Sequence, residues 1–463
     1  MQDSGVAGFF ADGGWRNLIM NLVACVFLFL AIKKDFEPYL LLPIAFGMLL
    51  VNLPYVANEI FVKGTTTYNA ITLAANVGIT NAQSEFIFAQ FTTFAEQLGF
   101  TISDGQATTA QLHKLMLIPE FQAVLPTGLG LNVTGAREVI NGIEHLYSYD
   151  YSGIFGYLYY GVKWGIYPCL IFLCIGATTD FGPLIANKKT MFLGAAAQIG
   201  IFIAFIGAIA LGKNGLGWTQ FDARIASSIS IIGGADGPTT ILVTSKLAPE
   251  YLSSIAVVAY SYMALVPVIQ PPIIRVLTSK EERLIKMENP REVSKIEKVL
   301  FPIAVTIITV LIVPSAGPLI GCLMLGNLIK ESGVVPKITE TLANSLMYIV
   351  TIILGVCVGC TADAETFLTL DTIIILLLGI VAFSAATAAG LLGGKLMSWL
   401  SKGKINPMIG AAGVSAVPMA ARVVHKEGIR EDPTNFLMMH AMGPNVAGII
   451  GSAVAAGVLL LLF

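Results

Sequence analysis

The chain has 463 residues, of which 55% are apolar and only 12% are charged. An average soluble domain carries about 25% charged residues, so this composition indicates a protein that lies largely inside a lipid bilayer. The formal net charge of −2 carries no information about nucleic-acid binding, but the sequence has no basic patch with interleaved aromatic residues. We therefore expect a polytopic membrane protein.

Ten apolar runs follow one another along the chain, and each is a candidate for a membrane-spanning helix. We expect transmembrane helices at 17–32, 38–54, 157–181, 191–211, 251–277, 299–313, 316–329, 341–362, 371–395 and 435–463. Two further segments, 225–246 and 406–424, are rich in Gly, Ala and Ser and are broken by Pro238 and Pro418. Irregular backbone at membrane depth survives only where protein or a water-filled cavity surrounds it. We predict that both segments are re-entrant hairpins.

Short motifs recur in the same order in the two halves of the sequence, which indicates an internal repeat. The matching pairs are Pro43 and Asn52 with Pro318 and Asn327, Gly176–Asp180 with Gly359–Asp363, and Ile232-Gly233 with Ile409-Gly410. The offset falls from 275 positions for the first pair to 183 for the second. This change places an insertion between the first two motifs, in the first half only.

The predicted fold class is an all-α polytopic membrane protein, an inverted repeat of five transmembrane helices plus one re-entrant hairpin per half. The predicted parts are 1–54 (first two helices), 55–150 (extramembrane insertion on the outer side), 151–277 (remainder of repeat 1, with hairpin 225–246), 278–298 (cytoplasmic linker) and 299–463 (repeat 2, with hairpin 406–424). An odd number of spans inverts the second half. With the N-terminus outside, most of the Lys and Arg residues face the cytoplasm, as the positive-inside rule requires.

The first predicted hairpin contains a carboxylate in a Gly-rich setting, Ile231-Ile232-Gly233-Gly234-Ala235-Asp236-Gly237-Pro238. Broken membrane helices expose carbonyl oxygens that bind Na⁺, and Asp236 adds a negative charge. Asp is also a good N-cap for the helix that follows the break. Both roles are compatible with the sequence.

Two further acids end apolar runs in the same local setting. Asp180 follows Thr178-Thr179 and precedes Phe181-Gly182-Pro183. An intramembrane acid marks an ion or proton path by default, and the alternative is an interfacial carboxylate near Lys188 and Lys189. For Asp363, a solvated position near an aqueous exit is favoured.

The second predicted hairpin offers neutral oxygens and one positive charge. Asn406 and Ser415 could complete a cation shell. Arg422 could bind an anionic substrate group through its planar guanidinium, although a lone Arg at a membrane edge is more often a positive-inside anchor. Asn445 follows Gly443-Pro444 in the last span and marks another break.

Four motifs resemble one known family closely. They are Gly-Ala-Thr-Thr-Asp ending at Asp180, Ile-Gly-Gly-Ala-Asp-Gly-Pro-Thr around Asp236, Ala-Tyr-Ser-Tyr-Met-Ala-Leu-Val-Pro around Tyr262, and His-Ala-Met-Gly-Pro-Asn-Val-Ala-Gly from His440. They are similar to the β subunit of the biotin-dependent, sodium-pumping decarboxylases of oxaloacetate, methylmalonyl-CoA and glutaconyl-CoA. The resemblance covers nearly the whole chain apart from 55–150.

The resemblance implies a division of labour between subunits. A carboxyltransferase subunit would move the substrate's carboxylate onto biotin, which a biotin carrier protein holds. This chain would receive carboxybiotin, decarboxylate it with uptake of a proton, and export Na⁺. A small single-span membrane subunit and a homo-oligomer within the complex are further expected partners, in the cytoplasmic membrane of a bacterium.

The resemblance also implies roles for individual residues, with Asp180 as the central carboxylate that exchanges Na⁺ for a proton. The predicted Na⁺ ligands are Asp180, Asp236, Asn406, Gly410, Ser415 and Asn445, the predicted catalytic residues are Asp180, Ser415 and Arg422, and the predicted contacts to carboxybiotin are Asn406 and Arg422. The alternative is a secondary Na⁺/H⁺ antiporter on a similar scaffold. The residues alone do not separate the two readings, because both need the same acids and broken helices.

Overall fold

The structure is a computed structural model, and it describes Phe9, residues 14–34, 38–54, 56, 136–140, 143–147, 154–213 and 215–463. The chain divides into two compact units, one formed by Met1–Val56 with Leu158–Phe463 and the other by Ala57–Tyr157. The predicted outer-side insertion, 55–150, falls mostly outside the described residues and stays a prediction.

The described part of the second unit is a two-stranded antiparallel sheet. Strand β1 (Ala136–Ile140) pairs with β2 (Ile143–Tyr147), so that Ile140 lies opposite Ile143 across the turn. The described residues of the first unit form helices joined by loops, with no strand among them, as the predicted all-α class requires. The β1–β2 hairpin of the second unit differs from that class.

The helices of the first unit fall into two series. Those before the predicted linker are α2 (Gly14–Lys34), α3 (Pro38–Val51), α9 (Ile154–Lys163), α10 (Ile166–Thr178), α11 (Gly182–Ala186), η1 (Lys188–Thr190), α12 (Met191–Ala197), α13 (Ile199–Leu211), α14 (Ala223–Ser230), η2 (Ile231–Gly234), α15 (Gly237–Leu247), η3 (Pro249–Tyr251) and α16 (Leu252–Leu277). Those from the linker onward are α17 (Lys280–Arg283), α18 (Lys295–Ile312), η4 (Pro314–Ala316), α19 (Gly317–Ser332), α20 (Pro336–Thr341), η5 (Leu342–Leu346), α21 (Met347–Gly359), α22 (Ala364–Phe367), α23 (Leu370–Leu400), η6 (Pro407–Gly413), α24 (Met419–Glu431) and α25 (Met438–Leu462).

Five of the described helical stretches are long and apolar enough to cross a membrane by themselves. They are Gly14–Lys33, Lys188–Leu211, Pro336–Gly359, Leu370–Leu400 and Met438–Leu462. Two bent pairs raise the number to as many as seven: α9 with α10, bent by 68°, and the two halves of the Pro249–Leu277 stretch, bent by 59°. The chain is therefore a multi-pass membrane protein by length and composition.

Three of the ten predicted spans are short or charged helices. Helix α3 has 14 residues and α19 has 16, and at 1.5 Å per residue they reach about 21–24 Å, against a hydrocarbon core of about 30 Å. Helix α18 begins at a capping box between Ser294 and Glu297, so its first turn is charged. Ten complete crossings remain a prediction.

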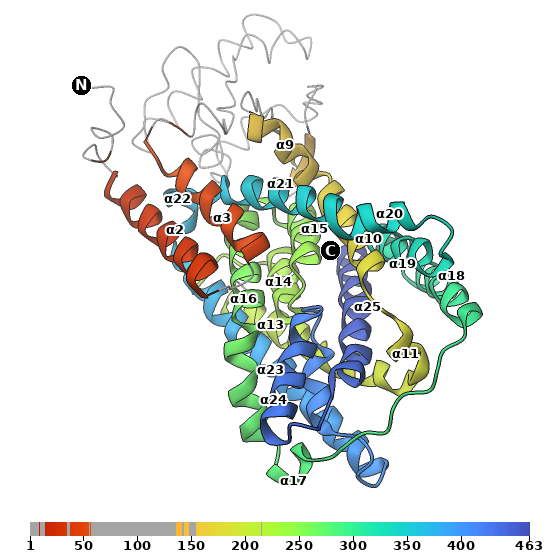
Figure 1. Cartoon of the computed structure of the whole chain (residues 1–463). Helices are drawn as coiled ribbons and strands as arrows, with labels where there is room; N and C mark the ends of the chain where they lie inside the picture. Colours follow the sequence, from red (N-terminus) through yellow and green to blue (C-terminus); the bar gives the residue numbers. More distant parts are fainter. Residues whose placement is uncertain are drawn as a thin grey trace, which may run out of the picture. The chain divides into compact units, whose positions relative to one another are not determined.

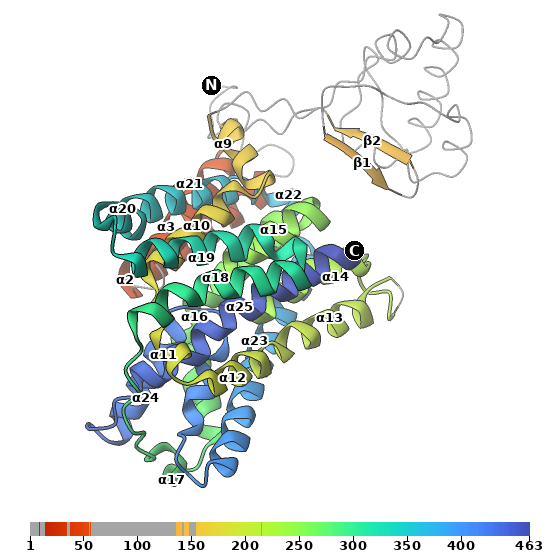
Figure 2. The ribbon, with the colours of Figure 1, turned by 90° about the vertical axis from the view of Figure 1, so that its right-hand side faces the viewer.

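Paired glycines let two sets of helices approach closely (Figures 1 and 2). On α10 and α19, a Cβ on Gly176 would lie 1.9 Å from the Leu323 carbonyl oxygen, and a Cβ on Gly326 would lie 2.0 Å from that of Leu173. On α3 and α21, a Cβ on Gly359 would lie 2.1 Å from the Ile44 carbonyl oxygen. Small residues at such crossings are typical of helix packing in membranes.

Both predicted hairpins are interrupted helices, and each rests on a glycine of a long helix. Segment η2 packs on α13, where a Cβ on Gly200 would lie 2.8 Å from the Gly233 carbonyl oxygen. Segment η6 packs on α23, where a Cβ on Gly390 would lie 2.2 Å from the Gly410 carbonyl oxygen. The breaks predicted in 225–246 and 406–424 are confirmed, and their re-entrant course stays a prediction. The break predicted at Asn445 is wrong, because α25 runs as one helix from Met438 to Leu462 with Pro444 inside it.

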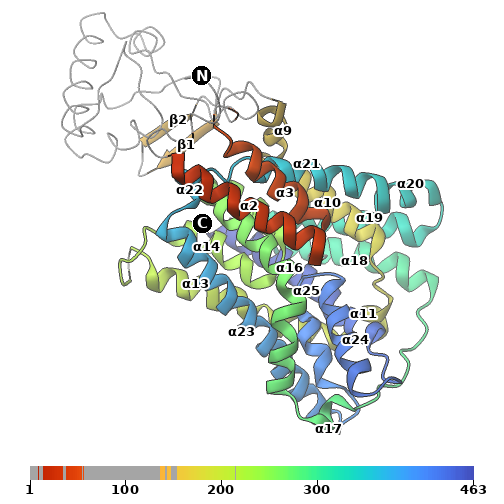
Figure 3. The same cartoon turned by 60° about the vertical axis from the view of Figure 1, so that its left-hand side comes forward.

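The outward faces of the long helices carry large apolar side chains. Exposed examples are Leu22 and Phe29 on α2, Phe202 and Ile206 on α13, Leu311 on α18, Ile373 and Leu377 on α23, and Leu461 on α25. Figure 3 shows α2, α13 and α23 as separate elements of this unit. Apolar surface of this extent indicates contact with lipid.

Candidate cation site at the two broken segments

Asp236 lies in the interior of the protein, at the point where η2 gives way to α15. The preceding Ala235 adopts a left-handed conformation, with φ of 56°, which turns the chain sharply. The Asp236 side chain caps α15, because its Oδ1 accepts a hydrogen bond from the Thr239 amide at 3.1 Å. The predicted capping role is therefore confirmed.

The second carboxylate oxygen of Asp236 is bound by the last helix. Ser452 of α25 donates its hydroxyl to Asp236 Oδ2 at 2.5 Å. Asp236 is only 4% exposed, and Ser452 is fully buried. A carboxylate in such surroundings is costly unless it is protonated, paired or bound to a cation.

The two broken segments meet beside this carboxylate. The Ser415 amide donates to the Gly234 carbonyl at 2.9 Å. From α25, the Asn445 side-chain amide donates to the carbonyls of Ala412 and Val414 at 3.0 and 2.7 Å. The two broken segments and the last helix therefore share one buried polar layer.

Gln198, between α12 and α13, extends this layer. Its side-chain amide donates to the Gly448 carbonyl at 3.1 Å, and a Cβ on Gly234 would lie 3.5 Å from its Oε1. Gly451, next to Ser452, packs against the same glutamine side chain. Gln198 therefore contacts the surroundings of both Asp236 and Asn445.

Four buried oxygens in the layer have no hydrogen-bond partner among the described residues. They are Gln198 Oε1, Thr239 Oγ1, Ser415 Oγ and Asn445 Oδ1. Each such atom costs about 1–3 kcal/mol unless a ligand or water satisfies it. Hydroxyl, amide and carboxylate oxygens are the ligands that hard cations take, so this donor set fits Na⁺.

These residues do not form a transition-metal site. No group of three or more His, Cys, Asp or Glu side chains in the described parts of the chain is placed to hold a metal ion. The layer instead offers one carboxylate and several neutral oxygens, which suits a monovalent cation of low charge density.

Asp180 lies elsewhere, at the break between α10 and α11. Its carboxylate is 44% exposed and lies 3.9 Å from the Lys298 ammonium, and its Oδ1 accepts from the Gly182 amide at 2.8 Å. Among the described residues it shares no partner with Asp236. Asp363 is half-buried at the equivalent end of α21.

The remaining predicted residues are divided between the layer and its surroundings. Asn406 is buried, and it donates to the carbonyls of Arg283 and Ile285 at 3.1 and 2.9 Å, so it anchors the linker. Gly410 serves the close packing of η6 on α23. Arg422 is exposed on α24.

Three residues of the layer were not predicted as ligands from the sequence: Gln198, Thr239 and Ser452. A signal for Ser452 was available, because it lies seven residues after Asn445 on α25, and residues two turns apart share a helix face. Gln198 is an isolated amide within an apolar stretch, and nothing local distinguishes it.

In this multi-pass helical protein, two broken helical segments meet around a buried carboxylate. Such an arrangement is typical of ion transporters. The family model described as the Na⁺-transporting oxaloacetate decarboxylase beta subunit matches residues 16–463. The chain belongs to this family.

The match to the family model also includes residues 55–150, which lie outside the motifs that resemble the family.

Three relatives are similar to the chain along nearly their whole length. The chain is 50% identical to methylmalonyl-CoA decarboxylase subunit beta of Propionigenium modestum, covering 96% of this chain and 95% of the relative. It is 46% identical to glutaconyl-CoA decarboxylase subunit beta of Acidaminococcus fermentans, covering 99% and 96%. It is 47% identical to the oxaloacetate decarboxylase beta chain of Klebsiella pneumoniae, covering 96% and 95%.

Proposed function

We propose that this chain couples the decarboxylation of carboxybiotin, presented by partner subunits, to the outward transport of Na⁺ with uptake of a proton. The observation that carries the proposal is the buried carboxylate of Asp236 beside four unpartnered oxygens. Family membership supports the decarboxylase over a secondary antiporter.

We infer that Na⁺ and a proton compete for this layer. A bound cation favours the ionised carboxylate, and an apolar interior favours the protonated one, so Asp236 alternates between the two. Ser415 and Asn445 supply neutral oxygens to Na⁺, while Ser452 holds the carboxylate in position. In this proposal Asp236 replaces Asp180 as the central acid.

The other predicted residues keep roles around this centre. Asn406 and Gly410 position the second broken segment. Asp180 lies outside the polar layer, at the break between α10 and α11. Arg422 stays a predicted contact for an anionic group on the cytoplasmic side.

We propose an inverted repeat with the N-terminus outside, on the support of the helix contacts. The Pro–Asn motif lies on α3 and α19, and the Gly-x-Thr-x-Asp motif begins at the ends of α10 and α21. Each Pro–Asn helix packs against the acidic-motif helix of the other half, as α3 with α21 and α19 with α10. A pseudo-twofold arrangement produces such reciprocal pairs.

The positions of the charged segments support the proposed orientation, with the N-terminus outside and the linker in the cytoplasm. The predicted cytoplasmic linker is held by ion pairs of Arg283 with Glu431 of α24 and of Lys286 with Asp432 just after it, and Arg275 at the end of α16 pairs with Glu427 of α24. Figure 1 shows α17 and α24 at the same end of the unit. This end is the proposed docking face for the carboxyltransferase subunit and the biotin carrier protein. The proposed location is a bacterial cytoplasmic membrane. A small single-span subunit and further copies of the chain are proposed to complete the complex.

One pair of variants tests the central carboxylate. We expect Asp236→Asn to abolish Na⁺-dependent decarboxylation and Na⁺ transport, because the neutral amide cannot exchange a proton for Na⁺. Asp180→Asn, at the half-exposed acid, should retain most of both activities. The measurement is ²²Na⁺ uptake into inverted vesicles that contain the whole complex, with CO₂ release followed in parallel.

The opposite result would identify the other acid as the carrier. If Asp180→Asn abolishes transport and Asp236→Asn does not, the exchange site lies at the α10–α11 break. Transport of Na⁺ by the wild-type chain without any decarboxylatable substrate would favour the antiporter.

A further inference from the structure

Gln198 is a buried amide near the middle of an apolar helical stretch. It lies between α12 and α13, within Lys188–Leu211, which is long and apolar enough to cross a membrane. The residue is only 7% exposed. Burying a polar side chain is costly unless its hydrogen-bonding atoms find partners, and the proposed function assigns no role to this one.

The hydrogen bonds of Gln198 determine which way its amide points. Nε2 donates to the Gly448 carbonyl at 3.1 Å and to the Gly194 carbonyl at 3.5 Å. Because carbonyl oxygens only accept hydrogen bonds, the amide nitrogen must face them and the amide oxygen must face away. Oε1 is buried without a partner among the described residues, and a Cβ on Gly234 would lie 3.5 Å from it. The oxygen is therefore presented to the first broken segment.

Helix α25 runs alongside the first part of this stretch in a constant register. A Cβ on Gly443 would lie 2.8 Å from Thr190 Oγ1, and a Cβ on Gly451 would lie 3.2 Å from Gln198 Nε2. These contacts are equally spaced on the two elements, from 190 to 198 and from 443 to 451. Gln198 therefore lies against the part of α25 where Ser452, the residue after Gly451, donates to the Asp236 carboxylate.

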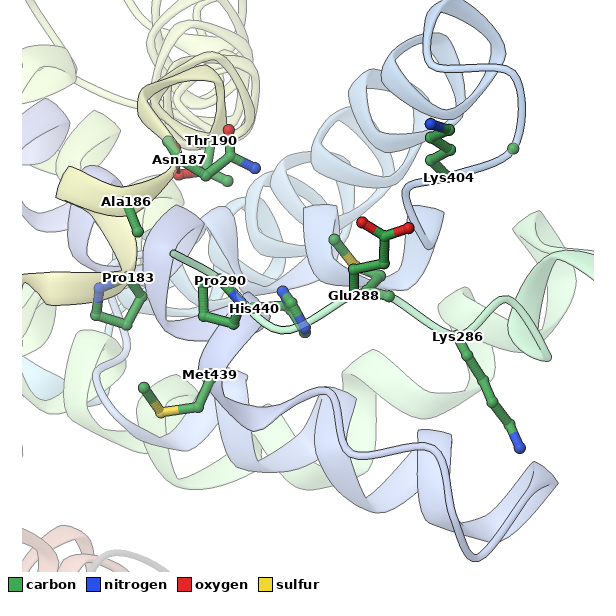
Figure 4. Close-up of a pocket in the computed structure, with 12 residues that line it drawn as sticks. Pro183, Ala186, Asn187, Thr190, Lys286, Glu288, Pro290, Lys404, Met439 and His440 are labelled. Atoms are coloured by element: carbon green, nitrogen blue, oxygen red, sulfur yellow. Dashed lines mark hydrogen bonds between the residues drawn. The ribbon is translucent and has the colours of Figure 1, made fainter. Parts of the chain in front are cut away.

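The same two elements line a cavity of about 300 Å³ at the end of the unit that carries the linker (Figure 4). Thr190 lines the cavity from one element, and His440 lines it from the start of α25. Gln198 follows Thr190 by about two helical turns, or roughly 12 Å along a helix. Both elements that surround the Gln198 amide therefore begin at an opening on the predicted cytoplasmic side.

A single carboxylate sets the charge of the polar layer. The segments that form the layer are 191–211, 225–247, 406–424 and 438–462. Asp236 is the only Asp or Glu in them, and their Lys and Arg residues, Lys246 and Arg422, are exposed. A monovalent cation therefore neutralises the layer, whereas a divalent cation would leave one uncompensated charge in a buried site, which is costly.

We propose that Gln198 Oε1 is a ligand of the transported Na⁺, and that the neutral amide at this position restricts the site to monovalent cations. This inference rests on the proposed function. An amide does not titrate as a carboxylate does, so Gln198 favours Na⁺ over the proton that competes for Asp236. A carboxylate at position 198 would give the layer two negative charges and suit it to a divalent cation.

Na⁺-dependent decarboxylation by the whole purified complex in detergent tests this inference. We expect Gln198→Met, which keeps the length of the side chain, to raise the Na⁺ concentration for half-maximal activity about tenfold, because one ligand is lost. Gln198→Glu loses the same amide donor but keeps an oxygen, so it should need less Na⁺ than Gln198→Met. It should also gain inhibition by Ca²⁺ that added Na⁺ relieves, at Ca²⁺ concentrations that leave the wild type active.

Gln270 of α16 is the matched control. Its Nε2 also donates to a carbonyl, that of Ala411, at 2.9 Å, and its Oε1 is also buried without a described partner. This hydrogen bond holds η6, whereas the amide of Gln198 contacts α25 and η2. Gln270→Met and Gln270→Glu should therefore keep the Na⁺ dependence of the wild type, and Gln270→Glu should gain no inhibition by Ca²⁺.

Two results would overturn the assignment of Gln198. One is an equal rise in the Na⁺ requirement for Gln198→Met and Gln270→Met, and the other is a Gln198→Glu complex that Ca²⁺ does not inhibit. The Ca²⁺ measurement decides by itself if Gln198→Met does not assemble, because a gained inhibition cannot come from misfolding. A wild-type complex that decarboxylates equally well without Na⁺ would instead overturn the proposed function.

Discussion

Individual residues in the polar layer differ in what their side chains can still bind. Asp236 has both carboxylate oxygens occupied, by the Thr239 amide and the Ser452 hydroxyl. Ser415 and Asn445 each keep one buried oxygen without a described partner. The layer therefore combines a carboxylate held in position by two hydrogen bonds with neutral oxygens that are free to bind a ligand.

At this scale we predict that Ser452→Ala weakens Na⁺ binding. A hydrogen bond to a charged group is worth about 1.5–3 kcal/mol, so the Na⁺ concentration for half-maximal decarboxylation should rise at least tenfold. Ser245→Ala is the matched control, because the Ser245 hydroxyl bonds the Leu242 carbonyl of its own helix. Equal Na⁺ dependence in the two variants would exclude Ser452 from the site.

Helix elements in this protein approach one another through glycines rather than through large side chains. Helix α19 shows the contrast within one element. A Cβ on Gly326 would lie 2.0 Å from the Leu173 carbonyl oxygen of α10, whereas a Cβ on Gly321 would meet no atom within 4 Å. The same residue type is therefore indispensable at one position and replaceable at the other.

We predict that Gly326→Ala destabilises the α10–α19 pair by about 1–3 kcal/mol or more, since backbone must move to admit the methyl group. Gly321→Ala should be neutral or stabilising by up to about 1 kcal/mol, because Ala is the better helix former. Thermal unfolding of the detergent-solubilised protein measures both. Equal unfolding temperatures for the two variants would contradict the close crossing.

At the scale of the whole unit, the linker is held to α24 and to the loop after it by charges. Hydrogen bonds from Lys286 and from Thr434 hold the pKa of Asp432 at about 2, well below its ordinary value. A lowered pKa means that the ionised form stabilises the fold at neutral pH. That contribution is complete above about pH 4 and is lost as the pH falls toward 2.

We therefore predict that the wild-type protein unfolds at a higher temperature than Asp432→Asn at pH 7, and that the difference shrinks as the pH falls below about 4. Thermal unfolding in detergent at several pH values measures this. Glu281→Gln, at an exposed acid of α17, should show no such pH-dependent difference. A constant difference in unfolding temperature between wild type and Asp432→Asn at all pH values would contradict a stabilising role for the ionised Asp432 carboxylate.

Several features of the molecule follow from the sequence by itself. Apolar runs predict a multi-pass membrane protein, and Gly-, Ala- and Ser-rich composition with Pro238 and Pro418 predicts the breaks in 225–246 and 406–424. The family is also evident from its motifs. These are local properties, because hydropathy and turn chemistry depend on neighbouring residues.

Only the tertiary structure distinguished the two acids. Asp180 and Asp236 stand in similar local sequences, yet Asp180 is partly exposed and Asp236 is buried. Burial of Asp236 depends on Ser452, 216 residues away in the chain, and on the meeting of two separate broken segments. Contacts between distant segments decide the local dielectric, and no window of sequence contains them.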